Sequence, residues 1–328
     1  MDRALHVVFG SGQVGPLLAR RLAGSGHRVR VVRRSEGPVP EGAEAFRGDA
    51  TDPGFCTEAA RGASVVYHCM NPAAYDRREW ARLVPRFAEN LVAAAGRAGA
   101  LLVVLDNLYM LGRTSGRPMD EETPVNPCSA KGEIRARAAE AILSAHRRGE
   151  VRTITGRASD FYGPGGVGTY FGPQFWRPAL AGKAVPMVVN PDTPHAYHYL
   201  GDVAAGLAAL GSAGDDSLGR AWMLPCAPAE TTRAMVERFA SGLGRPIRLL
   251  RVPGLALRAL GLFSPILREL SEMSYQWDEP FVVDDRRFRA RFGFGATPLE
   301  DGARETMAWA RRAYAAREDG RGATAPTR

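Results

Sequence analysis

Six residues near the start of the chain have the spacing of a phosphate-binding turn. Residues 10–15 (GSGQVG) match the pattern G-x-G-x-x-G. Gly10 permits a tight turn, Gly12 lets a pyrophosphate approach the main chain, and Gly15 lets a helix pack close to a strand. The free N–H groups at the start of that helix favour phosphate. We therefore expect the turn, with Gln13 and Val14 in it, to bind a dinucleotide.

The segments around this turn have the order that such a site needs. Residues 5–9 read as an apolar strand, residues 16–23 as a helix with proline in its first turn, and residues 28–32 as a second strand. A glycine pattern alone is weak, but a strand–turn–helix–strand context makes it specific.

Two arginines end the second predicted strand, where NAD-binding units usually have an acid. Arg33 and Arg34 precede Ser35, and arginine suits a 2′-phosphate through paired, charge-assisted hydrogen bonds. This pattern favours NADP(H) over NAD(H). The alternative is that the pair reflects composition, because only Lys131 and Lys183 among the 43 basic residues are lysines.

Strands and helices alternate through the first half of the chain. Further strands are predicted at 44–47, 64–68, 101–105 and 151–155, and long helices at 77–98 and 129–147. This order predicts an α/β fold with a Rossmann-type, doubly wound parallel sheet. We expect a dinucleotide-binding domain at 1–160, a smaller and partly interleaved substrate-binding region at 161–316, and a disordered polar tail at 317–328.

Composition narrows the class of protein. The net charge of +8 could suit nucleic acid, but acids are interleaved with the arginines and no nucleic-acid motif is present. The four cysteines are widely spaced, with no metal-binding pattern. We expect a cytoplasmic protein with no metal, no nucleic-acid partner and no membrane association, since no signal peptide or uninterrupted apolar span is visible.

Four further segments, in order and at consistent spacing, resemble one family. They are residues 48–52 (GDATD), 90–95 (NLVAAA), 157–164 (RASDFYGP) and 197–203 (YHYLGDV). Over residues 4 to about 312 the chain resembles the extended short-chain dehydrogenase/reductases, also called the NAD-dependent epimerase/dehydratase family. The resemblance implies that Asp49 and Ala50 lie at the adenine, and that Ala158, Ser159 and Asp160 lie beside the nicotinamide.

The chain departs from this family at its catalytic residues. The family segment S-x-Y-G-x-S-K-x-x-x-E corresponds to residues 129–140 (SAKGEIRARAAE), so that Lys131 stands at the tyrosine and Arg135 at the lysine. The usual Ser/Thr falls on Asn107. The chain therefore resembles a divergent, atypical branch.

Some chemistry survives these changes. Lys131 could stabilise negative charge on an oxygen and contact the cofactor, and Arg135 could hold a ribose or phosphate. Asn107 could donate a hydrogen bond to a carbonyl. Tyr109, two residues further along an expected strand, would point the same way as Asn107 and is our candidate replacement proton donor. Packing is the alternative role for Tyr109 and Lys131.

The resemblance also places part of the second half at a small-molecule substrate. His195, Tyr197 and Tyr162 are the candidates for contact with it, although an exposed loop is the alternative setting for His195. The helices at 77–98 and 129–147 correspond to the family's usual dimer-forming pair, which favours a homodimer.

These observations lead to one main prediction and two alternatives. The main prediction is an NADP(H)-dependent oxidoreductase that transfers hydride to or from a small carbonyl or conjugated compound. The first alternative is a nucleotide-sugar epimerase or dehydratase. The second is a non-catalytic NADP(H)-binding sensor, which the loss of the usual catalytic residues would suit.

Overall fold

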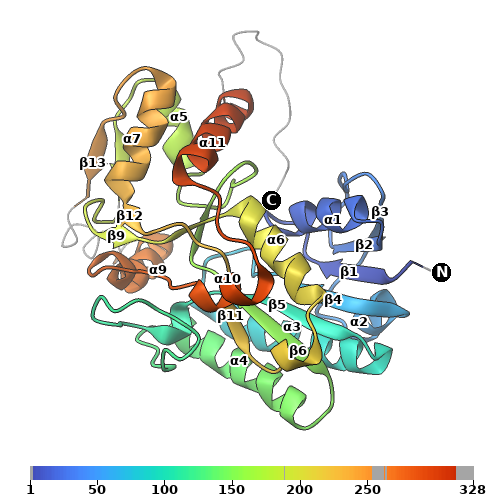
Figure 1. Cartoon of the computed structure of the whole chain (residues 1–328). Coiled ribbons are helices and arrows are strands. Elements are labelled where there is room, and N and C mark those ends of the chain that lie inside the picture. Colours follow the sequence, from blue (N-terminus) through green and yellow to red (C-terminus); the bar gives the residue numbers. More distant parts are fainter. Residues whose placement is uncertain (1–2, 188, 253–261, 263, 315–328) are drawn as a thin grey trace.

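A seven-stranded parallel sheet forms the centre of the molecule (Figure 1). The computed structural model describes residues 3–187, 189–252, 262 and 264–314. Neighbouring strands pair in parallel throughout. In spatial order the strands are β11 (Ala221–Met223), β6 (Arg152–Arg157), β5 (Leu101–Asp106), β4 (Ala63–His68), β1 (Leu5–Phe9), β2 (Arg28–Arg33) and β3 (Ala43–Arg47).

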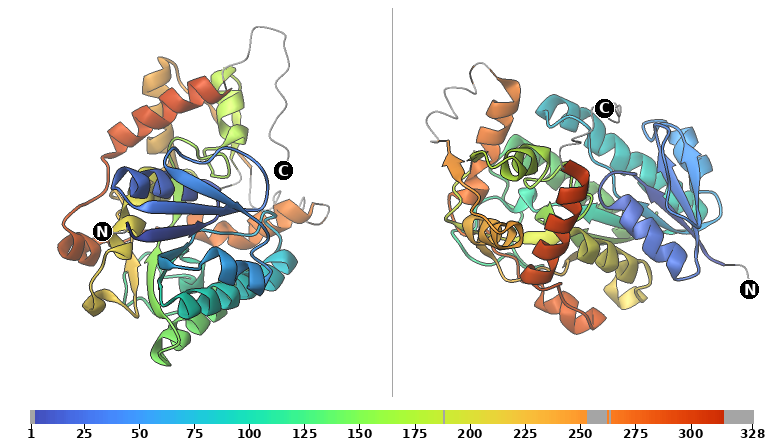
Figure 2. Two further views of the ribbon diagram at one scale, coloured as in Figure 1. Left: turned by 90° about the vertical axis from the view of Figure 1, so that its right-hand side faces the viewer. Right: turned by 90° about the horizontal axis from the view of Figure 1, so that it is seen from above.

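Helices cover both faces of this sheet (Figure 2), which is why β1, β4 and β5 at its centre are mostly apolar. Along β1, successive side chains point to opposite faces, so that Val7 packs in one core cluster and Val8 in the other. The Val8 face is covered by α1 (Gly15–Gly24) and α6 (Leu200–Gly211). Three lie on the Val7 face, α2 (Pro53–Ala59), α3 (Arg77–Ala98) and α4 (Ala130–Arg147).

Side-chain caps set the starts of the two long helices. The Asp76 side chain accepts hydrogen bonds from the backbone N–H groups of Arg78 and Glu79 at the start of α3. Ser129 accepts one from Gly132 at the start of α4. Both helices match their predicted ranges to within a residue. The cap at Ser129 matters for function, because α4 carries Lys131 and Arg135 in its first two turns.

The later part of the chain forms a second layer at one end of the sheet (Figure 1). Its core is rich in aromatic side chains from α5, α7 and α11. Its helices are α5 (Pro173–Leu180), α7 (Thr232–Leu243), α9 (Pro265–Met273) and α11 (Leu299–Tyr314), with a 3₁₀ turn at Ser274–Trp277. α10 (Arg286–Phe292) instead packs on the Val8 face of the central sheet, and the other 3₁₀ turns, Tyr109–Leu111 and Asp215–Ser217, lie beside that sheet. Its strands are β7 (Asp160–Tyr162), β8 (Val185–Met187), β9 (Pro194–His195), β10 (Tyr197–Tyr199), β12 (Glu230–Thr231) and β13 (Leu249–Arg251).

The predicted Rossmann-type α/β fold is confirmed, with one local correction. β5 ends at Asp106, and a 3₁₀ turn starts at Tyr109. The expectation that Asn107 and Tyr109 point the same way along a strand is therefore wrong. The predicted tail at 317–328 lies outside the described residues. No helix in the described part of the chain is long and apolar enough to cross a membrane.

Candidate functional site

The glycine turn cannot accept side chains at two of its three glycines. Gly10 has φ +112°, and a Cβ there would lie 2.7 Å from the carbonyl oxygen of Cys69. A Cβ on Gly15 would lie 1.8 Å from the carbonyl oxygen of Gly10. Both contacts are with backbone, which cannot move aside as a flexible side chain can. These two glycines are therefore required by the fold of the turn itself.

Gly12 differs, because no protein atom lies within 4 Å of the position of its Cβ. The main chain here is open to the outside, at the start of α1, where no acidic side chain occupies the first turn and no side chain caps the helix. Such an open N-terminus suits a pyrophosphate. The residues present therefore fit a dinucleotide. Val14, in the same turn, is buried, and contact of Gly12 and Val14 with its phosphates remains a prediction.

Gln13 links this turn to the second layer. Its side-chain oxygen accepts a hydrogen bond of 3.0 Å from the backbone N–H of Gly168. The loop that carries Gly168 thus reaches across to the glycine turn. This contact was not predicted, since nothing in the sequence pairs residues 155 positions apart.

The two arginines after β2 have different settings. The Arg33 guanidinium donates to the carbonyl oxygens of Pro38 (2.8 Å) and Glu36 (3.0 Å), so it holds the loop that follows. Arg34 and Ser35 are exposed. Of the pair, Arg34 is therefore better placed to meet a 2′-phosphate.

The segment after β3 lies next to these arginines. Asp49 is exposed, and its carboxylate accepts a hydrogen bond of 2.9 Å from the backbone N–H of Thr51. That bond is the main cause that lowers the pKa of Asp49, and the charge of Arg34 lowers it further. Ala50 is buried, and its carbonyl oxygen accepts from the side chain of Asn90 at 2.8 Å. Asp49 thus remains ionised beside Arg34, and Asn90 anchors the segment to α3.

Lys131 lies at the family's tyrosine position in a fully buried setting. Its ammonium pairs with the Glu269 carboxylate and lies 3.8 Å from that of Glu272, both on α9. It also lies 4.4 Å above the ring centre of Tyr75. A second contact holds α9 there, because Glu272 accepts from the backbone N–H of Ala130 at 2.5 Å. Lys131 is thus partnered by protein groups on two sides.

Arg135, one turn further along α4, is also partnered. Its guanidinium donates to the side chain of Asn71 at 2.5 Å, lies 3.5 Å from the Asp106 carboxylate, and lies 5.0 Å from the ring centre of Trp80. Its Nε is buried and has no hydrogen-bond partner among the described residues. The guanidinium is therefore fixed, with one N–H still unsatisfied.

Two tyrosine hydroxyls meet in front of these cations. The hydroxyl of Tyr75 donates to that of Tyr109 at 3.4 Å, and the Tyr109 ring stacks on Trp80 with a centroid distance of 6.0 Å. Asn107 accepts from the backbone N–H of Tyr109 at 3.1 Å and so orients it. Burial raises the pKa of Tyr109, and the negative charge of Asp160 raises it further. Tyr109 therefore stays a neutral hydroxyl that can donate.

The stretch after β6 brings a carboxylate to the same place. The backbone N–H of Ala158 donates to the backbone carbonyl oxygen of Asp106 at 3.0 Å. The backbone N–H of Ser159 donates to Nδ1 of His198 at 3.1 Å, and its hydroxyl donates to a backbone carbonyl oxygen. Asp160 follows, with its side chain 25% exposed and 2.8 Å from Nε2 of His195. Ala158 and Ser159 thus serve to position Asp160.

The three substrate candidates are all buried. The hydroxyl of Tyr197 bonds to that of Thr232 at 2.8 Å, and Tyr162 packs against Gly302. His195 lies in β9 with its side chain fully covered, which contradicts the alternative of an exposed loop. Substrate contact by these residues remains a prediction.

Five predicted site residues therefore lie around one place, beyond the carboxyl ends of β5 and β6: Asn107, Tyr109, Lys131, Arg135 and Asp160. Sequence reasoning missed three of their partners, namely Tyr75, Glu269 and Glu272. A buried lysine needs an acid, which is a usable signal, but its position more than 130 residues away is not readable from the chain. Among the described residues, no group of three or more metal-binding side chains occurs.

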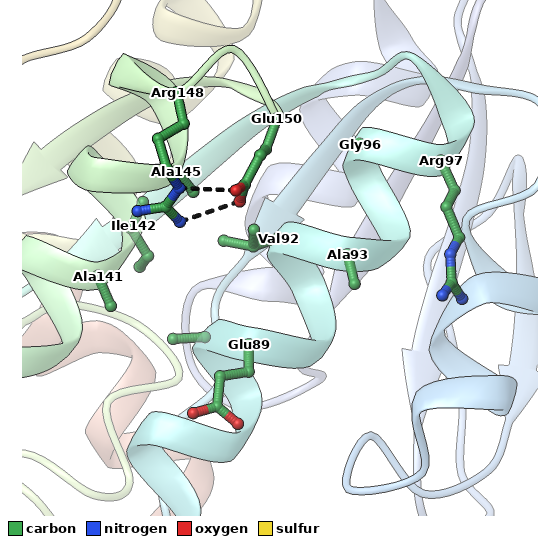
Figure 3. Close-up of a pocket in the computed structure, with 11 residues that line it drawn as sticks. Glu89, Val92, Ala93, Gly96, Arg97, Ala141, Ile142, Ala145, Arg148 and Glu150 are labelled. Atoms are coloured by element: carbon green, nitrogen blue, oxygen red, sulfur yellow. Dashed lines mark hydrogen bonds and ion pairs between the residues drawn. The ribbon is translucent and has the colours of Figure 1, made fainter.

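A separate groove of about 580 Å³ runs between α3 and α4 (Figure 3). Small and apolar side chains such as Val92, Ala141 and Ile142 line it, and the Arg148–Glu150 ion pair lies at one end. It occupies the two helices expected to form a dimer, away from the residues described above. The homodimer remains a prediction.

Comparison with known families gives the setting for this site. The model of the NAD dependent epimerase/dehydratase family matches residues 7–222. The chain belongs to this family. The match covers the glycine turn, both long helices and the carboxyl ends of the central strands, but not α9, which carries Glu269 and Glu272.

Solved structures of the same fold cover nearly the whole chain. A UDP-glucuronic acid 4-epimerase from Bacillus cereus, in complex with NAD, has a TM-score of 0.77 at 15% identity, over 96% of this chain and 99% of that one. MoeE5, in complex with UDP-glucose and NAD, has 0.76 at 21%, over 94% and 99%. A nucleoside-diphosphate-sugar epimerase from Pseudomonas aeruginosa has 0.75 at 18%, over 94% and 98%. No curated protein sequence matched.

Proposed function

We propose that this family member binds a nicotinamide dinucleotide at residues 10–15 and transfers hydride at a carbon that bears oxygen in a nucleotide sugar. The observation that carries the cofactor part is the open approach to Gly12 at an uncapped helix start. The substrate class is proposed from relatives of the same fold, MoeE5 in complex with UDP-glucose and a UDP-glucuronic acid 4-epimerase. This reverses the order of the sequence-based prediction, which ranked a small carbonyl compound first.

The residues at the usual catalytic positions would act indirectly. The Lys131 ammonium lies against the face of the Tyr75 ring, and the Arg135 guanidinium lies against Trp80. Tyr109 stacks on Trp80. The two cations thus support an aromatic wall that ends in the hydroxyls of Tyr75 and Tyr109. When bound, the nicotinamide would supply reversible hydride exchange. Tyr109 would donate a hydrogen bond to the substrate oxygen as negative charge develops there.

We propose further that the cofactor is NADP(H). Arg34 is exposed at the end of β2, beside the ionised Asp49, in a position to pair with a 2′-phosphate. Against this, Arg33 donates its hydrogen bonds to the loop that follows it, and two relatives are in complex with NAD. The choice therefore depends on one arginine.

The experiment is incubation of the purified protein with UDP-sugars and each dinucleotide. The proposal expects a product changed at a sugar carbon, detected by chromatography and NMR, and dependent on NADP⁺ or NAD⁺. Dinucleotide binding without any change in a broad set of nucleotide sugars would exclude this substrate class.

A reductase of small carbonyl compounds is the second candidate, and Asp160 favours it. Its carboxylate is partly exposed and, when ionised, would repel the diphosphate of a nucleotide sugar. Oxidation of NADPH with ketones, enones and quinones would test this candidate. Binding with no turnover in either panel would leave the non-catalytic sensor.

A further inference from the structure

His195 is a buried histidine between two parallel aromatic rings. Its ring lies 4.4 Å from that of Trp277, at an angle of 3°, and 5.1 Å from that of Phe281, at 12°. Backbone pairing of β9 with Phe281 fixes this arrangement, with hydrogen bonds on both sides of His195. Aromatic faces on both sides are a favourable setting for a cationic ring.

Both ring nitrogens of His195 face oxygens that accept hydrogen bonds. Nδ1 lies 3.2 Å from the backbone carbonyl oxygen of Gln276, and Nε2 lies 2.8 Å from a carboxylate oxygen of Asp160. A neutral imidazole has one N–H and one lone pair. If its hydrogen is on Nε2 and points to an ionised Asp160, the lone pair on Nδ1 points at the carbonyl oxygen of Gln276, which has no hydrogen to donate. The arrangement therefore calls for one extra hydrogen, either on the second ring nitrogen or on the carboxyl.

Two other buried histidines show what the neutral form looks like in this molecule. Nδ1 of His68 accepts from the backbone N–H of Met70 at 3.2 Å, and Nδ1 of His198 accepts from that of Ser159 at 3.1 Å. Burial lowers the pKa of His68 to about 3 and that of His198 to about 4. In both, a lone pair faces a donor. His195 has no such donor among its two ring-nitrogen partners.

The other member of the pair, Asp160, is partly open to solvent. Asp160 is 25% exposed, whereas the His195 side chain is fully covered. The charge of Asp160 is close enough to raise the pKa values of Tyr75 and Tyr109, the two hydroxyls of the aromatic wall, although burial is the larger cause for both. A proton held by the pair can therefore leave through Asp160, the exposed member.

We propose that Asp160 and His195 form a proton-holding pair and that Asp160 is the acid/base residue of this site. This inference rests on the proposed hydride transfer for its catalytic part, but not for the extra proton. In reduction, a carbonyl oxygen would gain the proton of the pair, while a bound reduced nicotinamide dinucleotide would supply hydride to the carbonyl carbon and be left oxidised. The C=O bond becomes CH–OH, and the pair becomes a carboxylate with a neutral imidazole, which regains a proton from water.

His195 acts through Asp160 and is a positioning residue. The titratable groups near the pair are Tyr75 and Tyr109 of the aromatic wall, and Tyr197 and His198 on β10. Burial holds all four neutral near pH 7, by raising the pKa of each tyrosine and lowering that of His198. The extra hydrogen therefore belongs to the pair and not to these four neighbours.

The first test needs no substrate. NMR of the unliganded protein with labelled histidine rings and aspartate carboxyls reports where hydrogens lie. At pH 7.5 we expect hydrogens on both nitrogens of His195, or one on the Asp160 carboxyl, while His68 and His198 each carry one. A single hydrogen on His195 beside an ionised Asp160 would overturn the proposal.

The variant Asp160→Asn sharpens this test. Its amide can donate to Nε2, so we expect His195 to hold only one hydrogen, on Nδ1. Turnover should fall about 10²- to 10⁴-fold, whereas His195→Gln should move the pH profile more than the maximal rate. Full turnover in Asp160→Asn with an intact wild-type spectrum would refute the catalytic role alone. If the wild type turned over no substrate, the proposed function would be refuted. The NMR spectrum would still test whether Asp160 and His195 share the extra hydrogen.

Discussion

The glycine turn and the start of α4 differ in how their residues are used. In the turn, Gly12 faces open space and the helix start is uncapped. At the start of α4, Lys131 and Arg135 are buried among acids and aromatic rings of the protein itself. The first region keeps the family's pattern and remains open to a ligand. The second has lost the pattern, and its replacements are fully integrated into the fold.

This difference shows that a replaced catalytic residue need not leave a gap. Lys131 contacts Glu269 and Tyr75, and Arg135 contacts Asn71 and Trp80. We therefore interpret both cations as supports for the wall that presents Tyr109.

The largest effect is expected on the stability of the fold, when the buried ion pair of Lys131 and Glu269 is broken. Glu269→Gln leaves the Lys131 ammonium without its main partner, which should lower the free energy of unfolding by about 3–5 kcal/mol in urea titrations. Glu272→Gln is the matched control. That carboxylate lies further from the ammonium and is partly exposed, so it should cost less. A loss below 1 kcal/mol in Glu269→Gln would mean that Lys131 is not structural.

The hydroxyl of Tyr109 should affect turnover without affecting stability to the same degree. In Tyr109→Phe the ring can still stack on Trp80, but the donor to the substrate oxygen is gone. We expect kcat to fall about 10²- to 10³-fold, measured with whichever substrate panel gives activity. Tyr75→Phe should have a smaller effect, and unchanged turnover in Tyr109→Phe would remove its assigned role.

Substitutions at Gly12 and Gly15 should distinguish an effect on dinucleotide binding from an effect on the stability of the fold. A methyl group on Gly12 meets no protein atom, so Gly12→Ala should unfold like the wild type but bind a dinucleotide about 100-fold more weakly. Gly15→Ala would clash with the backbone of Gly10 and should lose stability as well. Equal dinucleotide binding by Gly12→Ala and the wild type would place the phosphates elsewhere.

The smallest effect is expected from substitution of Arg34, as a change in affinity for the cofactor. Arg34→Ala removes a charge-assisted hydrogen bond to a 2′-phosphate, so affinity for NADP(H) should fall about tenfold while that for NAD(H) stays the same. Fluorescence titration with both cofactors measures this. If Arg34→Ala weakens both equally, or neither, the preference for NADP(H) has no basis at this residue.

The chain order of strands and helices, and the glycine turn, were predictable because they depend on local patterns. The apolar strand at residues 5–9 and the caps at Asp76 and Ser129 are readable from neighbouring residues alone. The partners of Lys131 were not, because Glu269 lies 138 residues away. The setting of His195 likewise depends on Asp160, Trp277 and Phe281, which meet only in the fold.

Calorimetric titration of NADP(H) and NAD(H) tests the central comparison most directly. It should compare the wild type, Gly12→Ala and the double variant Lys131→Met, Glu269→Leu, in which apolar residues replace both buried charges. We predict that the wild type and the double variant bind a dinucleotide with the same Kd, while Gly12→Ala binds about 100-fold more weakly. A double variant as weak as Gly12→Ala, or a wild type that binds neither cofactor, would contradict this account.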